Sequence, residues 1–415
     1  MPKSVTTATD RQILRDLAAQ VAEIAALPVQ QETIRLWRAN NALRPVRPLV
    51  LIDQVPWHEL NVNDELTLRC QDEFCRGLET ELRRRLYCWN HLRADMVVEP
   101  FLDLGKVFHD DGFGLRIEEH TAALDPQNDI QGHLYIDQLK TDEDLAKIRA
   151  PHITLDEPAT AALEARAREI LDGLLQVRMI GYGAWFRLWD IIPMWHSVES
   201  CLMDLADRPD FVHRLMRRFT DAHFQMLDDL EAKGYLHGPQ SLIHCTGAWT
   251  DELPAPGYDP AKPRARDIWT AGMAQIFSSV SPAMHQEFEI DYAIPWYARF
   301  GLGYYGCCEP LDRKLDIVRL LPHVRKVSMS PWVDVERGAE GLGRDFVFSR
   351  KPAPVRLAGD SVDWPAVEAD LRATRAACAR HGCPLEFTLK DVSTVQYHPE
   401  RLWQWADLAM RVVKE

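Results

Sequence analysis

The stretch GLGYYGCCEPLDRKLDIVRLLPHVRKVSMS, residues 301–330, contains two short apolar runs on either side of a helical pattern. The runs GLGYYGCCE and VRKVSMSPWVD are typical of buried strands, and LDRKLDIVRLL between them is typical of a helix. A strand, a helix and a second strand in direct succession imply parallel strands joined by a right-handed crossover. This unit predicts an α/β fold.

The same alternation extends in both directions from residue 156 onward. Strands are expected at 177–183, 241–247, 266–277, 301–309, 324–334, 345–352 and 384–394. Helices are expected at 156–175, 208–234, 281–301, 311–321 and 363–382, with one more at the end. So many units over about 250 residues favour a closed (β/α)8 barrel of the TIM type. No GxGxxG follows the first strand, which disfavours an open dinucleotide-binding sheet.

The N-terminal part precedes the first unit of this barrel. Residues 1–48 are expected to form a helical extension, because 9–27 is amphipathic and a second helix follows Pro28. The barrel is expected to span 49–415, beginning with the strand LVLID, with a helix at 72–93. Extended runs at about 95–140 predict inserted strands or hairpins.

Composition limits the classes of partner. The 415 residues carry a formal charge of −14 without a basic cluster, which argues against nucleic acid as a partner. No apolar run approaches the roughly 20 residues of a bilayer span. The nine cysteines are an odd number with irregular spacing, and the start has no apolar signal segment, so a reduced, cytoplasmic protein is expected. A homodimer is also expected.

In a barrel, the residues at the carboxyl ends of the strands face the active site. Those positions hold Asp53, His244, Cys245, Gln275, Cys307, Cys308, Glu309, Ser328, Ser330, Asp334, Ser349, Arg350, Lys351, Lys390 and Asp391. Strand alternation places Tyr305, Cys307 and Glu309 on one face and Tyr304 and Cys308 on the other, although the turn at Pro310 could reorient either cysteine.

The block VSPAMHQEFEIDYAIPWYARFGLGYYGCCEP, residues 280–310, resembles the uroporphyrinogen decarboxylase superfamily, and within it the corrinoid-dependent methyltransferases. The resemblance covers roughly residues 160–412. Where those methyltransferases end a strand in His-x-Cys-Gly, this chain has Tyr305, Gly306, Cys307 and Cys308, so one cysteine carries over and the histidine does not. Where they have Pro-Gly-Cys on the final strand, this chain has LKDVST. The decarboxylase branch matches less well, because no arginine-rich segment follows the first strand.

The resemblance implies a TIM barrel and zinc-assisted methyl transfer. Thiolate, imidazole and carboxylate are zinc ligands, so Cys307, Cys308, Glu309 and His244 are the predicted metal ligands. A bound cation makes an ether or amine a better leaving group. No corrinoid-binding DxHxxG segment occurs, so a separate protein would supply the corrinoid that accepts the methyl group.

Further side chains complete the predicted site. Glu309, Lys390 and Asp391 are the predicted catalytic residues. The residues expected to contact the substrate are Gln275, Trp269, Tyr304, Ser330, Trp332, Arg350 and Lys351. Arg350, Lys351 and Lys390 would hold an anionic group, and the aromatic rings would line the apolar part of the substrate.

Two other functions are consistent with the same residues. A metal-independent decarboxylase or lyase of this fold would use Lys390, Arg350 and Asp391 to bind and protonate a carboxylated small molecule. A non-catalytic binder of small molecules is the second. The paired cysteines could also be small buried hydrophobes, and Glu309 a structural ion-pair residue.

Overall fold

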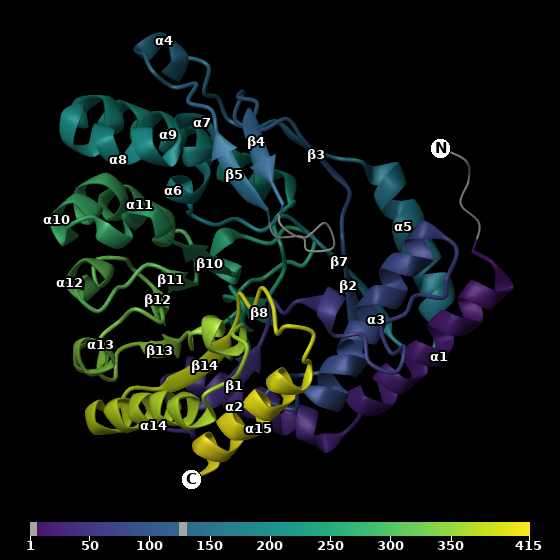
Figure 1. The fold of residues 1–415 in the computed structure, drawn as a ribbon. Helices are drawn as coiled ribbons and strands as arrows, with labels where there is room; N and C mark the ends of the chain where they lie inside the picture. Colours follow the sequence, from purple (N-terminus) through teal and green to yellow (C-terminus); the bar gives the residue numbers. More distant parts are fainter. Residues whose placement is uncertain (1–5, 124–130) are drawn as a thin grey trace.

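A six-stranded parallel sheet lies at the centre of the computed structural model, which describes residues 6–123 and 131–415 (Figure 1). Its strands, in spatial order, are β1 (Leu49–Ile52), β14 (Leu385–Leu389), β13 (Val347–Arg350), β12 (Val324–Met329), β11 (Leu302–Tyr305) and β10 (Trp269–Gly272). All five neighbouring pairs are parallel. The α/β class predicted from 301–330 is confirmed.

The sheet continues past β10 through isolated bridges. Phe186 pairs in parallel with Gly272, and Tyr182 pairs in parallel with Leu236. The strand preceding this segment, β7 (Gln176–Ile180), pairs in parallel with β2 (Phe101–Gly105). Among the described residues no ladder joins β2 to β1, so hydrogen bonds do not close these strands into the complete eight-stranded barrel that was predicted.

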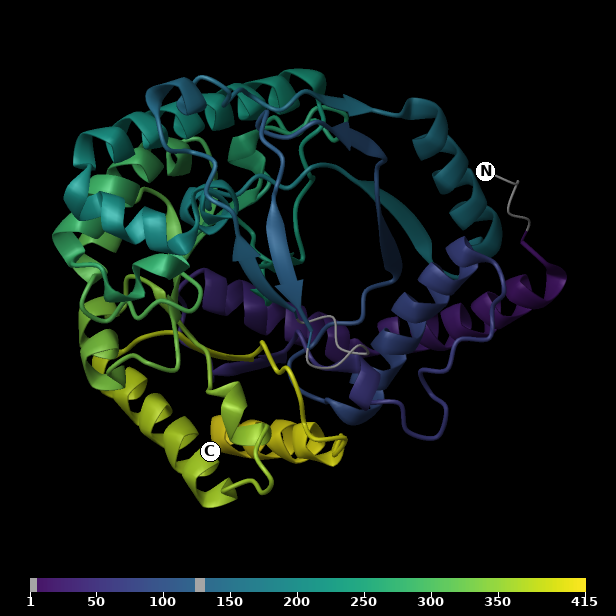
Figure 2. The same ribbon diagram turned by 45° about the horizontal axis from the view of Figure 1, so that its top comes forward.

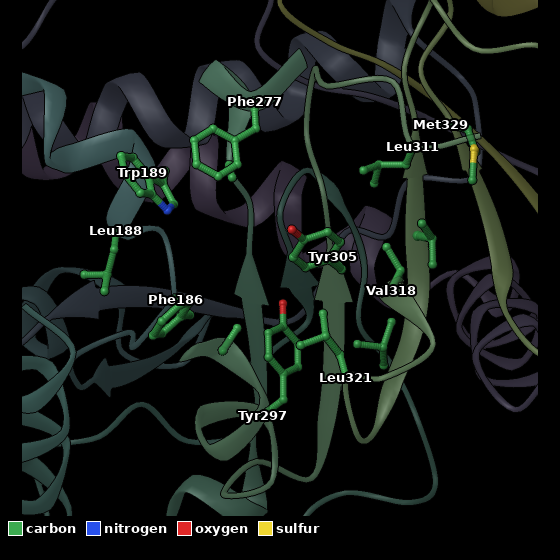
Figure 3. Packing of buried hydrophobic residues seen from close by; sticks show 14 of the residues in the cluster. Phe186, Leu188, Trp189, Phe277, Tyr297, Tyr305, Leu311, Val318, Leu321 and Met329 are labelled. Carbon is green, nitrogen blue, oxygen red and sulfur yellow. The ribbon is translucent and has the colours of Figure 1, made fainter. Parts of the chain in front are cut away.

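Helices cover the outer face of the sheet (Figure 1). They include α9 (Pro209–Lys233), α11 (Asp291–Tyr297), α12 (Leu315–Val318), α13 (Val335–Leu342), α14 (Trp364–His381) and α15 (Glu400–Lys414). The largest hydrophobic core lies between these helices and the strands. Figure 3 shows Phe277, Tyr297 and Tyr305 in the part of this core around β10 and β11.

The predicted N-terminal helices are confirmed as α1 (Ala8–Ala25), α2 (Pro28–Asn41) and α3 (Glu73–His91). Helix α1 packs against α3 and α5 (Glu157–Leu171) around a second, smaller core. Figure 2 shows these three helices side by side near the N-terminus. The domain boundary predicted after residue 48 stays a prediction.

One predicted segment differs in detail. The run 241–247 forms an antiparallel hairpin of β8 (Leu242–Ile243) and β9 (Thr246–Gly247) where one strand was expected. A two-residue hairpin turn of type I′ has positive φ at both central residues, and His244 and Cys245 have φ of 42° and 66°.

The predicted insertion at 95–140 contains β2, β3 (Phe108–Asp110), β4 (Glu119–Ala122) and β5 (Gly132–Tyr135). Strands β4 and β5 pair as an antiparallel hairpin, as expected for an inserted segment. Residues 124–130 of this insertion lie outside the described part of the chain. None of the helices in the described ranges combines the length and apolar character that a bilayer span requires.

A buried ion pair lies on the inner face of the sheet. Lys326 Nζ on β12 is 2.8 Å from Glu386 Oε2 on β14, and both side chains are fully buried. The ammonium also donates to the carbonyl of Gly247 at 2.7 Å. Thr246 Oγ1 donates to Glu386 Oε1 at 2.7 Å, and Asn40 Nδ2 of α2 donates to Glu386 Oε2 at 3.2 Å. The pair therefore links two strands, a hairpin and an N-terminal helix.

Breaking this pair is expected to destabilise the fold strongly. Lys326→Met leaves the Glu386 carboxylate buried without its cation, and such a change typically lowers the free energy of unfolding by about 3–5 kcal/mol. The double variant Lys326→Met/Glu386→Leu removes both charges and should be less destabilised than Lys326→Met alone. Urea denaturation of the full chain measures both. A loss below about 1 kcal/mol for Lys326→Met would contradict the structural role given to the pair.

Candidate active site

Polar side chains gather at the carboxyl ends of the parallel strands. The mouth is defined here as Asp53, His244, Cys307, Lys351 and Lys390. Asp53 follows β1, Cys307 follows β11, and Lys351 and Lys390 follow β13 and β14. His244 occupies the turn between β8 and β9. Since these strands run in the same direction, their ends meet at one edge of the sheet, as the sequence predicted.

Gly306 decides which face of β11 carries Cys307. Its φ of 92° is in the left-handed region, and an added Cβ would lie 2.4 Å from Leu311 Cδ1. This residue interrupts the alternation of the strand. Tyr304 and Cys307 both belong to a small cluster of buried residues on the inner face of the sheet. Tyr305 instead belongs to the largest hydrophobic core, between the strands and the outer helices. The expectation that Tyr305 and Cys307 share a face was therefore wrong.

The closest contact in the mouth joins a lysine to a cysteine. Lys390 Nζ donates to Cys307 Sγ at 3.3 Å and lies 2.9 Å from Asp391 Oδ2. Burial lowers the pKa of Lys390, but Cys307 and Asp391 favour its charged form and raise the pKa above its usual value. Lys390 is thus a buried, protonated ammonium held between a sulfur and a carboxylate.

Cys307 and Cys308 influence each other's ionisation. Their sulfur atoms are 3.7 Å apart. The hydrogen bond between them raises the pKa of Cys307, together with burial, and lowers the pKa of Cys308, to which the charge of Lys390 contributes. Cys308 is therefore the thiol that ionises first, although it is Cys307 that contacts Lys390.

His244 and Cys245 reach the mouth through their strained turn. Burial lowers the pKa of His244, so its imidazole is neutral near pH 7, and among the described residues its Nε2 has no hydrogen-bond partner. Burial, with Asp53 nearby, raises the pKa of Cys245 to about 12. Gln54 and Asp391, which also follow strand ends, have positive φ. Strained backbone of this kind is common at functional sites.

Glu309 is fully buried and faces backbone. Its Oε1 accepts a hydrogen bond from the Ala274 amide at 3.1 Å, and its Oε2 accepts one from the Cys307 amide at 2.9 Å. Lys314 supplies a nearby positive charge, although burial lowers the pKa of that lysine to about 8. Glu309 therefore ties the ends of β10 and β11 together and positions Cys307.

The predicted zinc ligands do not fit a metal site as arranged. Both carboxylate oxygens of Glu309 bind amides, and the Lys390 ammonium lies against Cys307, where it would repel a cation. Within 6–123 and 131–415, no three His, Cys, Asp or Glu side chains are grouped so that they could hold a metal ion. Lys390 comes from the final strand, where the resemblance would place a second metal-ligating cysteine.

Three predicted substrate residues lie at or below the mouth. Lys351 is buried, donates to Ser349 Oγ at 3.0 Å and lies 5.3 Å above the ring of Tyr304. The Tyr304 ring also packs edge-on against His244 at 5.0 Å. Trp269 lies deeper, where its Nε1 donates to the carbonyl of Ala248 at 3.0 Å. Asp391 joins this group through Lys390.

For the four other predicted substrate residues, no hydrogen bond, ion pair or ring contact within the described ranges joins them to the mouth. Gln275 donates through Nε2 to Asp190 Oδ2 at 2.6 Å. Arg350 points toward α14, where it pairs with Asp370 at 3.1 Å. Ser330 is buried with no partner for its hydroxyl among the described residues, and Trp332 is 74% exposed.

One cavity beside the mouth was missed from the sequence. It has a volume of about 590 Å³ and is lined in part by Tyr182, Trp185 and Arg187. These residues belong to the run GYGAWFRLWD, 181–190, which continues the strand predicted at 177–183. An arginine and aromatic residues at a strand end were the signal that could have revealed it.

Comparisons with known proteins give little further information. The sequence matches no protein-family model, and no curated protein is significantly similar to it. One solved structure with a similar shape is a methyltransferase from Methanosarcina mazei. It is 10% identical in sequence with a TM-score of 0.47, and the alignment covers 91% of this chain and 96% of that one. A likeness this weak carries no argument about function.

The arrangement predicts that the protein does not retain stoichiometric zinc. Protein purified without an affinity tag should contain well below one zinc per chain by plasma mass spectrometry. A Cys307→Ser/Cys308→Ser variant should have the same low content, because these sulfurs do not belong to a ligand set. About one zinc per chain that disappears in the variant would overturn this geometry and restore the predicted metal site.

Proposed function

We propose that this chain is an enzyme that removes a methyl group from a small methoxylated or methylated compound and transfers it to a separate acceptor. One observation carries the proposal: the Lys390 ammonium lies 3.3 Å from Cys307 Sγ at the carboxyl ends of the strands. This is the position where the resemblance to the corrinoid-dependent methyltransferases implies a cation. We propose that in this chain a lysine takes the place of that zinc ion.

The lysine can perform the chemistry expected of that cation. When a nucleophile attacks the methyl carbon, the new bond to carbon forms as the bond from carbon to the heteroatom breaks. The electron pair stays on the heteroatom, and negative charge develops there. Lys390 donates a proton to that atom and is reprotonated by solvent. Because its neighbours raise the pKa of Lys390, it is a weak acid and suits a strongly basic leaving atom, and its charge also stabilises the negative charge that develops there.

The surrounding side chains position the acid and the substrate. Cys307 and Asp391 accept hydrogen bonds from Lys390 and fix its direction. Glu309 in turn fixes the Cys307 amide. Lys351, the second buried cation of the mouth, is suited to an anionic group on the substrate.

The methyl acceptor is proposed to be a reduced corrinoid on a partner protein. The chain has no corrinoid-binding DxHxxG segment, and none of its own residues in the mouth is needed to activate such a nucleophile. A dimer of this chain and a cytoplasmic location remain predictions from the sequence.

A second function is favoured by the two buried lysines. Lys351 and Lys390 together with a neutral His244 would also suit a carboxylated substrate that loses carbon dioxide. There the carbon–carbon bond breaks, its electron pair remains on the substrate carbon, and Lys390 donates the proton to that carbon. This reaction also proceeds without a metal.

Replacing Lys390 distinguishes a catalytic role of this lysine, in either reaction, from a purely structural one. Lys390→Met should lower kcat/KM by about 100-fold or more, because it removes both the proton and the charge. Lys351→Met should raise KM more than it lowers kcat. The assay follows methylcobalamin formation from free cob(I)alamin, with methoxylated aromatic compounds and methylamines as donors.

The controls decide between the outcomes. Arg214→Gln, a change at an exposed ion pair with Asp142, should leave the rate unchanged. If the Lys390→Met variant turned over substrate at the rate of the wild type, the proposed mechanism would be refuted. Carbon dioxide release from carboxylated compounds without methylcobalamin formation would favour the second function.

A further inference from the structure

Cys307 and Cys308 are the only two cysteines that are adjacent in the sequence, and both are free thiols. Their sulfur atoms lie 3.7 Å apart at the mouth. Cys307 is 4% exposed, whereas Cys308 is only partly buried. Cys308 Sγ is therefore the sulfur that a small reagent from solvent reaches first, and Cys307 Sγ is a second sulfur directly beside it.

The pair lies in a bend between the end of β11 and Pro310, outside any strand or helix. Within this bend the Cys307 amide donates to Glu309 Oε2 at 2.9 Å, and the Cys307 carbonyl accepts a hydrogen bond from Ser328 Oγ at 2.7 Å. The backbone of Cys307 is thus fixed on both sides. Rotation of the Cys308 side chain can bring its sulfur toward that fixed partner.

Two charged groups contact the sulfurs. Lys390 Nζ donates to Cys307 Sγ at 3.3 Å, and Cys308 Sγ donates to Asp391 Oδ2 at 3.7 Å. An ammonium stabilises negative charge on a nearby sulfur, and a carboxylate can accept a thiol proton. Cysteines that respond to oxidants combine solvent access with a second cysteine within reach. Cys308 and Cys307 have this arrangement.

A disulfide between adjacent residues is strained. Neighbouring Cα atoms across a trans peptide are about 3.8 Å apart, whereas the Cα atoms of most disulfides are about 4.4–6.8 Å apart. Strain of this kind makes a disulfide easier to reduce, and easily reduced disulfides are the labile and regulatory ones. A bond between Cys307 and Cys308 would therefore be reversible and not a permanent structural link.

We propose that Cys307 and Cys308 are an oxidation site at which hydrogen peroxide converts the two thiols into a reversible disulfide. In the first step Cys308 Sγ bonds to one peroxide oxygen as the O–O bond breaks. Asp391 passes the thiol proton to the hydroxide that leaves, which becomes water, and Cys308 is left as a sulfenic acid. Cys307 Sγ then bonds to Cys308 Sγ, the S–O bond breaks, and the departing hydroxide takes the Cys307 proton and becomes a second water. The two sulfurs lose two electrons, and the peroxide gains them.

Closure of the disulfide changes the surroundings of Lys390. The distance between the sulfurs falls from 3.7 Å to about 2.05 Å, so Cys307 Sγ turns toward Cys308. Lys390 then loses one of the two groups that fix its direction. That this loss slows methyl transfer rests on the proposed function, whereas formation of the disulfide does not.

One tryptic peptide reports on the pair alone. Cleavage after Arg299 and Arg313 releases residues 300–313, which contain both cysteines and no other. The full chain is treated with hydrogen peroxide, its remaining thiols are alkylated, and the peptide is weighed by mass spectrometry. It should carry no alkyl group and be lighter than the reduced peptide by two hydrogen atoms. Dithiothreitol added before alkylation should restore two alkylated cysteines.

Single variants distinguish the two sulfurs. Cys307→Ser removes the second sulfur, so Cys308 should stop at the sulfenic acid, which dimedone traps. Cys308→Ser removes the accessible sulfur, so Cys307 should stay available for alkylation. Cys88→Ser replaces another partly buried cysteine and should form the disulfide like the wild type.

Two results would overturn the proposal. One is wild-type protein in which both thiols of peptide 300–313 stay free after peroxide treatment. The other is oxidation of Cys308 to a sulfinic acid without any disulfide to Cys307. Because the experiment measures thiols and not turnover, it gives the same result whether or not the chain transfers methyl groups.

Discussion

The ion pair of Lys326 and Glu386 is the interaction on which the interior of the sheet depends. Two charges removed from water are tolerable only if each is paired and its remaining hydrogen-bonding capacity is used. Gly247, Thr246 and Asn40 meet that requirement. Helix α2 and the hairpin of β8 and β9 are consequently fixed against the inner face. The hairpin then carries His244 to the mouth, so a buried charge pair deep in the fold determines where part of the site lies.

In the proposed mechanism, an ammonium at the mouth takes the place of the zinc ion that the resemblance implies. A zinc ion needs several ligands with free lone pairs pointing at a common centre. Here the Glu309 lone pairs are used by amides, and an ammonium on the last strand already contacts Cys307. An ammonium is a weaker electrophile than zinc, but it brings a transferable proton. The residues therefore favour acid catalysis at a site whose resemblance implies a metal.

Local pattern was sufficient to predict much of the fold. The strand–helix–strand unit at 301–330 and the amphipathic period of 9–27 require only short-range information, and both elements form as expected. The sequence also placed Cys307 and Lys390 at strand ends. Their mutual contact could not be read from the sequence, because it depends on how far the curved sheet brings residues 83 positions apart together.

The errors have identifiable physical causes. Gly306 adopts a positive φ, which breaks the two-residue period, so the inner face receives Tyr304 and Cys307 together. Arg350 is the last residue of β13, and the alternation of that strand turns its side chain outward to Asp370 on α14. Trp332 directly follows Pro331, and its side chain is exposed to solvent. In each case the residue type suited the site, and backbone direction at the strand end decided the outcome.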